Sequence, residues 1–236
     1  MIFSFHNKKK LFTMPYSLNS SPVKEVLSRL HAAADQQEAL MSADIEREVQ
    51  KRNAKVDSDL ADLLAEAYIP VPAEVGRLIY ILARSTNSRT LVEFGTSYGI
   101  STIYLAAAVR DTGGGRVITT EMNMAKARQA AKNFDEAGLL SFIDLREGDA
   151  RQTLRDVDGP VDFVLLDGWK NLYLPVLQVI ESKLRPGALI VADDLDVFPE
   201  AHKPYLDYVR APENGYASIE IPLGDRVEIS VRTITS

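Results

Sequence analysis

The chain has 236 residues, of which 46% are hydrophobic and 25% charged, a composition typical of a globular protein with one large domain or one domain plus a helical extension. It contains no cysteine, which excludes disulfide frameworks, thiolate zinc sites and cysteine nucleophiles. The formal net charge of −6 argues against a nucleic-acid-binding protein, because phosphate backbones are bound by clustered Lys and Arg.

The first 20 residues include three consecutive lysines, but no apolar stretch of signal-peptide length follows them. We therefore expect a flexible N-terminal tail over residues 1–20. No window of the chain approaches the roughly 18 consecutive apolar residues of a membrane span. These observations predict a cytoplasmic protein that has no membrane partner.

A helical extension is predicted over residues 21–72. Ser21 followed by a proline is a helix-start signal, and amphipathic stretches continue over 39–49 and 60–68 until two prolines end them. The apolar stripe of the 60–68 stretch packs either against the core or against a partner subunit. Because an exposed apolar stripe must be covered, we expect a homodimer.

From residue 73 onward, short apolar runs alternate with longer amphipathic stretches. This alternation predicts a parallel sheet with helices on both faces, the doubly wound α/β architecture. Two period-two runs about a turn at 223–226 predict a C-terminal antiparallel hairpin after the five parallel strands of this Rossmann-like sheet. Strands are predicted over 90–94, 116–121, 143–147, 161–167 and 188–193, and helices over 73–84, 101–110, 124–137, 150–156, 172–184 and 199–209.

The turn after the first strand is a candidate ligand site, because ligands of open parallel sheets bind beyond the carboxyl ends of the strands. It contains Glu93, Gly95 and Gly99, and the N–H groups of the helix that begins near Ser101 suit an anionic group. Ser97 stands where the dinucleotide pattern G-x-G-x-x-G requires glycine, which counts against a nicotinamide oxidoreductase. The glycines alone are a weak signal, since many strand-to-helix turns only change direction.

Acidic residues follow the second and third strands. Glu121 is placed to accept both hydroxyls of a ribose, although a solvated carboxylate at a helix start is an equal alternative. Asp149 either meets an adenine amino group or caps the next helix. Neither residue decides the function by itself.

Three carboxylates follow the fourth and fifth strands, and they carry the strongest signal. Asp167 ends the fourth strand, and Asp193 and Asp194 end the fifth. Three such groups at neighbouring strand ends repel one another unless a cation or protonation neutralises them, and oxygen ligands suit Mg²⁺. The alternative is that one or two of them cap helices and the third faces water. Their convergence favours a metal site.

The segment DGWKNLYLP, followed by LRPGALIVADDL, resembles the cation-dependent class I S-adenosylmethionine O-methyltransferases of the catechol and caffeoyl-coenzyme A type, whose pattern is D-x-W-K-x-x-Y and then A-D-N. VEFGTSYGIS and ITTEMN resemble the glycine turn and the ribose-binding acid of that family. The resemblance covers about residues 70–233. It implies a methyltransferase domain over 73–236.

The resemblance also implies a role for individual residues. Lys170 would be the general base, with Asp167 beside it, and a divalent cation, most simply Mg²⁺, would be held by Asp167, Asp193 and Asp194. Asp194 departs from the family, which has Asn there, and Gly168 replaces a larger residue, leaving the adenine side of the pocket less filled. S-adenosylmethionine would be bound by Glu93, Gly95, Ser101, Glu121, Met122, Asp149, Ala150, Asp167 and Trp169.

The implied reaction is methyl transfer from S-adenosylmethionine to a hydroxyl of a small hydroxylated aromatic, a catechol above all, because two adjacent oxygens can chelate one cation. Glu220 on the penultimate strand contacts the acceptor or points outward. His31 and His202 are expected on the surface. The alternatives are a methyltransferase that needs no metal and a non-catalytic S-adenosylmethionine-binding protein.

Overall fold

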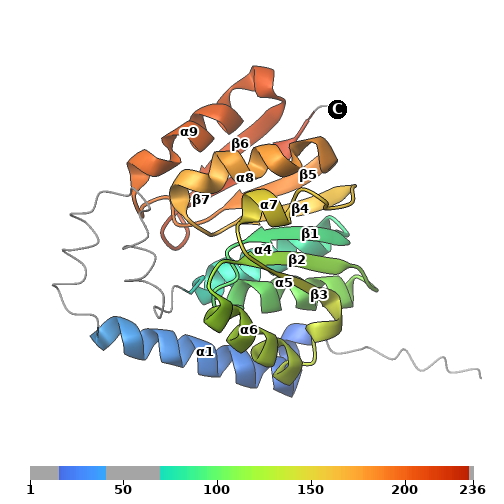
Figure 1. Cartoon of the computed structure of the whole chain (residues 1–236), viewed down its shortest axis with the longest axis vertical. Helices are drawn as coiled ribbons and strands as arrows, with labels where there is room; N and C mark the ends of the chain where they lie inside the picture. The colour runs from blue at the N-terminus through green and yellow to red at the C-terminus, as the bar shows by residue number, and fades with distance from the viewer. Residues whose placement is uncertain (1–15, 41–69, 234–236) are drawn as a thin grey trace, which may run out of the picture.

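The computed structural model describes residues 16–40 and 70–233 (Figure 1). The predicted stretches over 39–49 and 60–68, and with them the apolar stripe behind the dimer prediction, lie almost wholly outside these residues. None of the helices within the two described ranges is both long enough and apolar enough to cross a bilayer.

The described strands form one seven-stranded sheet in the order β3-β2-β1-β4-β5-β7-β6. The first five strands are parallel, and β5 pairs antiparallel with β7. The predicted α/β class and the terminal hairpin are confirmed. The strands are β1 (Thr90–Phe94), β2 (Arg116–Glu121), β3 (Ile143–Glu147), β4 (Val161–Leu166), β5 (Leu184–Ala192), β6 (Tyr216–Ile221) and β7 (Val227–Arg232).

Helices cover both faces of the sheet because side chains alternate along each buried strand. In β1, Leu91 belongs to the apolar cluster that includes α4 and α5, whereas Val92 belongs to the cluster that includes α8. The α-helices are α1 (Ser21–Leu40), α4 (Ala73–Ser85), α5 (Ile100–Asp111), α6 (Met124–Glu136), α7 (Ala150–Thr153), α8 (Tyr173–Ile180) and α9 (Pro199–Arg210).

Short 3-10 helices connect several of these elements. They are η1 (Ser17–Asn19), η2 (Leu140–Phe142), η3 (Lys170–Leu172), η4 (Glu181–Lys183) and η5 (Pro212–Asn214). Among them, η3 has the most direct bearing on the site, because it begins with Lys170.

The strand β5 begins at Leu184, earlier than predicted, and helix α8 ends correspondingly early at Ile180. Pro186 and Gly187, a pair of residue types that usually marks a turn, lie inside it. The pairing of β4 with β5 shifts register between Val161 and Phe163, and such an irregularity is where a strand tolerates a proline.

The N-terminal segment is part of the main core. Within the stretch expected as a tail, Ser17 is buried and its N–H donates to Asp111 Oδ2 at 2.8 Å. Helix α1 contacts α5 and α6, and in Figure 1 it runs alongside α6. Its apolar residues, repeating at helical spacing, are Val23, Val26, Leu27 and Leu30, all buried in the cluster of α5 and α6.

Candidate functional site

The carboxyl end of β1 carries a buried carboxylate. Glu93 is 0% exposed, and its Oε2 accepts hydrogen bonds from the hydroxyls of Thr102 and Thr119, each at 2.5 Å. Burial raises the pKa of Glu93, and hydrogen bonding by the neighbouring hydroxyls opposes this rise. The other oxygen, Oε1, is buried with no hydrogen-bond partner in the described part of the chain. It is therefore able to accept a bond from a bound ligand.

The turn after β1 approaches the end of β4 so closely that it has no room for a side chain. Gly95 has φ 102°, and a Cβ built on it would lie 2.4 Å from the carbonyl oxygen of Asp167. The neighbouring strand end thus contacts the glycine backbone directly, so Gly95 keeps the β1 turn beside Asp167.

Gly95→Ala is expected to lower the melting temperature by roughly 10 °C, because the substitution combines a disfavoured φ with a backbone clash. Gly138→Ala is the matched control, since Gly138 also has positive φ, at 66°, but its Cβ would meet nothing within 4 Å. The control is expected to lose only about 2–4 °C. Thermal unfolding followed by circular dichroism measures both, and equal losses would contradict the close approach.

Glu121 joins the turns that follow β1 and β2. Its Oε2 accepts the backbone N–H of Ser97 at 2.8 Å, and its Oε1 accepts that of Asn123 at 2.8 Å. The carboxylate is half-buried and faces the glycine turn, whereas the neighbouring Met122 is 53% exposed. This geometry places Glu121, the predicted ribose ligand, beside the glycine turn.

Asp149 has the geometry of the capping alternative. It is the N-cap of α7 and accepts the backbone N–H of Arg151 at 2.8 Å. Its other oxygen receives the Arg151 guanidinium at 2.7 Å, and this hydrogen bonding lowers the pKa of Asp149. Both oxygens are therefore engaged within the turn itself, and the buried Ala150 follows it.

The three predicted metal ligands converge. Because Leu166 of β4 pairs with Ala192 of β5, the residues that follow them, Asp167 and Asp193, lie at one edge of the sheet. Asp167, Asp193 and Asp194 each offer a carboxylate oxygen, and these oxygens lie within 4.8 Å of one another. All three side chains are nearly or fully buried.

The Lys170 ammonium supplies a positive charge to this group. It lies 2.7 Å from Asp194 Oδ2 and 3.8 Å from Asp167 Oδ1, and it donates to the Tyr173 hydroxyl at 3.0 Å. Burial by itself would lower the pKa of Lys170, but Tyr173, Asp194 and Asp167 together raise it well above its ordinary value. Lys170 is therefore an ammonium in this structure.

Asp194 pairs with the Lys170 ammonium, whereas Asp193 has no such partner among the described residues. Both of its carboxylate oxygens are buried and have no hydrogen-bond partner among the described residues. Burial, and then the charge of Asp194, raise the pKa of Asp193 to about 7. An unpartnered buried carboxylate next to two others is a costly arrangement that a divalent cation would relieve. The donor set therefore fits a hard cation.

Among the described residues, Phe94 fills the space beside Gly168 where a gap is predicted. A Cβ on Gly168 would lie 2.5 Å from the ring of Phe94, so the aromatic ring occupies the space that a larger residue would take. The prediction of a less filled pocket at this point is wrong, because it considered position 168 without its neighbour across the sheet. Trp169 follows and packs against the adjacent core cluster.

Both histidines differ from their predicted surface places, whereas Glu220 has the outward orientation that is one of its two predicted alternatives. His202 is 0% exposed rather than on the surface, and its Nε2 lies 3.0 Å from the carbonyl oxygen of Asp194 and 3.1 Å from that of Val197. Glu220 is engaged by the guanidinium groups of Arg210 and Arg226. His31 is half-buried. No local sequence signal identifies these contacts, because each joins residues of different elements.

Residues 92–195 match the protein family described as a methyltransferase domain. The chain is 37% identical over 139 residues to the catechol O-methyltransferase of Niastella koreensis, covering 56% of this chain and 62% of that protein. It is 32% identical over 171 residues to a probable O-methyltransferase of Mycobacterium tuberculosis, covering 66% of this chain and 71% of that protein. The match thus spans less than two thirds of the Niastella relative.

A solved structure shares the fold. It is an O-methyltransferase from Streptomyces achromogenes in complex with SAM, and it superimposes with a TM-score of 0.65 at 24% sequence identity, covering 79% of this chain and 90% of that chain. At this sequence identity the likeness establishes the fold.

Proposed function

Because this chain belongs to the class I S-adenosylmethionine-dependent O-methyltransferases, we propose that it transfers a methyl group from S-adenosylmethionine to a hydroxyl of a small, catechol-like acceptor with the help of a divalent cation. The observation that carries the proposal is the convergence of Asp167, Asp193 and Asp194 within 4.8 Å, beside the buried Lys170. The glycine turn that would receive the donor contacts Asp167 directly.

The acceptor class follows from the donor set. Two adjacent hydroxyls can chelate one cation that three carboxylates hold, whereas a single hydroxyl cannot. The catechol O-methyltransferase named among the relatives supports this choice. A catechol, rather than a simple phenol, is therefore the acceptor that we assign.

The donor would be held by groups at the ends of β1 and β2. The free Oε1 of Glu93 would accept a hydrogen bond from the ammonium of the methionine moiety, with Ser101 beside it. Glu121 would accept hydroxyl hydrogens of the ribose. Gly95 would let the backbone approach the donor closely.

The acid cluster and Lys170 would divide the remaining work. When bound, a divalent cation would lower the pKa of a hydroxyl that it contacts, and S-adenosylmethionine would supply an electrophilic methyl group. Asp167 and Asp194, which pair with Lys170 in this structure, would be among the residues that hold the cation, and weaker ion pairing would lower the pKa of Lys170. After its ammonium has released a proton to solvent, the neutral Nζ of Lys170 would accept the hydroxyl proton as general base.

Transfer of labelled methyl groups from S-adenosylmethionine tests the proposal. We expect catechol to be methylated in the presence of Mg²⁺, EDTA to abolish the transfer, and excess Mg²⁺ to restore it. Phenol is the matched control acceptor and is expected to react at least about tenfold more slowly, since it offers one oxygen instead of two. Turnover that EDTA leaves unchanged would support the metal-independent alternative, and donor binding without transfer to any hydroxyl would support the non-catalytic one.

A further inference from the structure

The segment that carries two of the three carboxylates has an unusual backbone. Residues 193–198 connect β5 to α9, and both Asp194 and Phe198 have positive φ, at 60° and 56°. Non-glycine residues adopt this region at a cost and remain there when surrounding contacts hold them. The positions of Asp193 and Asp194 therefore depend on what holds this segment.

The turn of the terminal hairpin provides backbone contacts to it. The N–H of Leu195 donates to the carbonyl oxygen of Arg226 at 3.1 Å, and the N–H of Asp196 donates to that of Asp225 at 2.9 Å. The Arg226 side chain adds to this connection. Its Nε lies 2.7 Å from Asp196 Oδ1, and its Nη1 lies 2.7 Å from Glu220 Oε1. One guanidinium thus joins the segment 193–198 to the strand β6.

On the hairpin side, the connection that Arg226 makes to Glu220 continues to a buried carboxylate. Glu228 of β7 is 0% exposed and stands opposite Ala192, the residue before Asp193. Arg210 of α9 binds Glu228 through two hydrogen bonds, Nε to Oε1 at 2.9 Å and Nη2 to Oε2 at 2.5 Å. The same Nη2 also reaches Glu220 Oε2 at 2.9 Å. A bidentate pair of this kind has a defined geometry.

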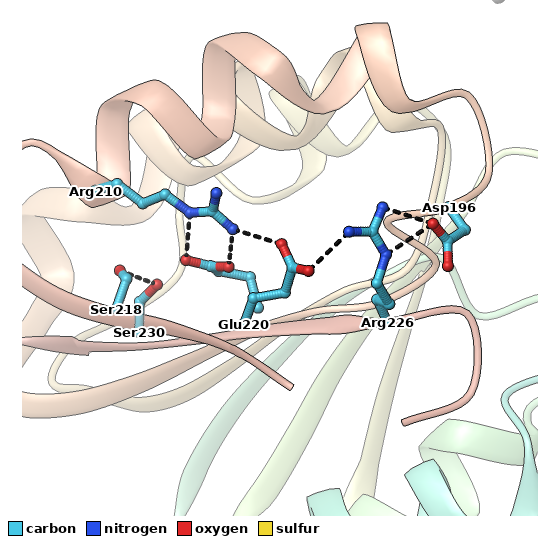
Figure 2. Close-up of polar contacts among 7 residues, drawn as sticks. Asp196, Arg210, Ser218, Glu220, Arg226 and Ser230 are labelled. Carbon is cyan, nitrogen blue, oxygen red and sulfur yellow. Dashed lines mark hydrogen bonds and ion pairs between the residues drawn. The ribbon is translucent and has the colours of Figure 1, made fainter. Parts of the chain in front are cut away.

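The strand register explains why two arginines are needed. Glu220 and Glu228 are directly opposite each other on β6 and β7, an arrangement in which like charges repel. Arg210 lies between the two carboxylates, and Arg226 takes the remaining oxygen of Glu220. Figure 2 shows Arg210, Glu220, Arg226 and Asp196 in one row along the hairpin. We refer to these four residues as the arginine–carboxylate chain.

We propose that the arginine–carboxylate chain holds the segment 193–198 in place, and that Arg226 is a positioning residue for the carboxylates of Asp193 and Asp194. This inference rests on the proposed function, because it concerns the affinity of that site for a divalent cation. Arg226 touches neither the acceptor nor the donor in this scheme. It acts through Asp196 and the backbone of Leu195.

Positioning and simple electrostatics predict opposite effects for one substitution. Arg226→Gln removes a positive charge near an acidic site, so Coulomb attraction alone would make a cation bind more tightly. Loss of positioning would make it bind more weakly, by about tenfold or more, as is usual when groups that orient metal ligands are removed. The sign of the change therefore separates the two explanations.

The test measures Mn²⁺ binding to the full chain by electron paramagnetic resonance of the free ion. We expect Arg226→Gln to raise the Mn²⁺ dissociation constant about tenfold. Arg226→Lys keeps the charge but cannot bridge Asp196 and Glu220, and it is expected to raise the constant about threefold or more. Lys203→Gln is the matched control on α9, because it removes one positive charge from an exposed pair with Asp207, and it is expected to change the constant less than twofold.

A double-mutant cycle sharpens the result. If Arg226 acts through Asp196, the double variant Arg226→Gln/Asp196→Asn should have an Mn²⁺ dissociation constant no higher than that of whichever single variant binds Mn²⁺ less tightly. An unchanged or lower Mn²⁺ dissociation constant in Arg226→Gln would overturn the inference. If the glutamine variant does not fold, an unchanged dissociation constant in Arg226→Lys would overturn it instead. A wild-type chain that bound no Mn²⁺ would overturn the proposed metal site as well, which separates the two failures.

Discussion

Lys170→Met is expected to lower the rate constant of methyl transfer by about 10²–10⁴-fold at saturating donor, acceptor and Mg²⁺, the range lost with a general base. The substitution removes the nitrogen that would take the hydroxyl proton and keeps a side chain of similar length. Donor binding should persist, because Glu93, Gly95 and Glu121 are at the ends of other strands. Single-turnover transfer of labelled methyl groups measures the rate, and calorimetry measures donor binding.

Lys203→Met is the control for this experiment. Lys203 is also a lysine paired with an aspartate, but its side chain is 65% exposed and lies on the surface of α9. We expect its rate to match that of the wild type. If Lys170→Met kept a rate within a few-fold of the wild type while it bound Mg²⁺, Lys170 would be an ion-pair partner of Asp194 and not the base.

Asp193→Asn should have opposite effects on cation affinity and on stability in the absence of a cation. As a proposed ligand, Asp193 should contribute strongly to cation affinity, and its loss is expected to weaken Mn²⁺ binding by more than about 100-fold. In EDTA at pH 8, however, the free energy of unfolding of the variant should exceed that of the wild type by up to about 4 kcal/mol. The reason is that the wild type then carries a buried carboxylate whose oxygens have no partner among the described residues.

The stability difference has a defined pH dependence. Burial and Asp194 raise the pKa of Asp193 to about 7 in the folded protein, against about 3.9 in the unfolded chain. The folded state therefore holds this proton more tightly, so the contribution of Asp193 to stability is retained below pH 4 and lost as the pH rises to 7. The advantage of Asp193→Asn should shrink accordingly between pH 8 and pH 5.5.

Urea unfolding in EDTA at these two pH values measures the effect. Asp207→Asn is the control, because the Asp207 side chain is 64% exposed and pairs only with Lys203 among the contacts described. Adding Mn²⁺ should reverse the order, since a cation that binds the folded state stabilises the wild type and not the variant. A variant less stable than the wild type at pH 8 in EDTA would contradict this account of Asp193.

Much of the fold could be predicted because its signals are local. The strands β1 and β2 lie where the apolar runs indicated, since a buried parallel strand is a short apolar run flanked by turn residues. The start of β5 was missed for an equally local reason: Pro186 and Gly187 are typical of a turn, and only the shifted pairing with β4 explains how they fit in a strand.

The candidate site was predictable to the extent that topology determines it. Parallel strands end at one edge, so Asp167 and Asp193 had to approach each other once β4 and β5 were neighbours. The pKa of Lys170 could not be predicted, because burial and the carboxylate at 2.7 Å act in opposite directions. The contacts of His202 and Arg226 join different elements, and no single segment reveals them.

The burial of α1 affects how this protein can be shortened or recombined. Val23, Leu27 and Leu30 belong to the same apolar cluster as the residues of α5 and α6, so the core does not end where the methyltransferase match begins. A fragment starting at Ala73 would uncover that part of the cluster to water and would tend to aggregate. Exchange of parts between relatives should therefore keep α1 together with the sheet, and place its junctions in exposed loops.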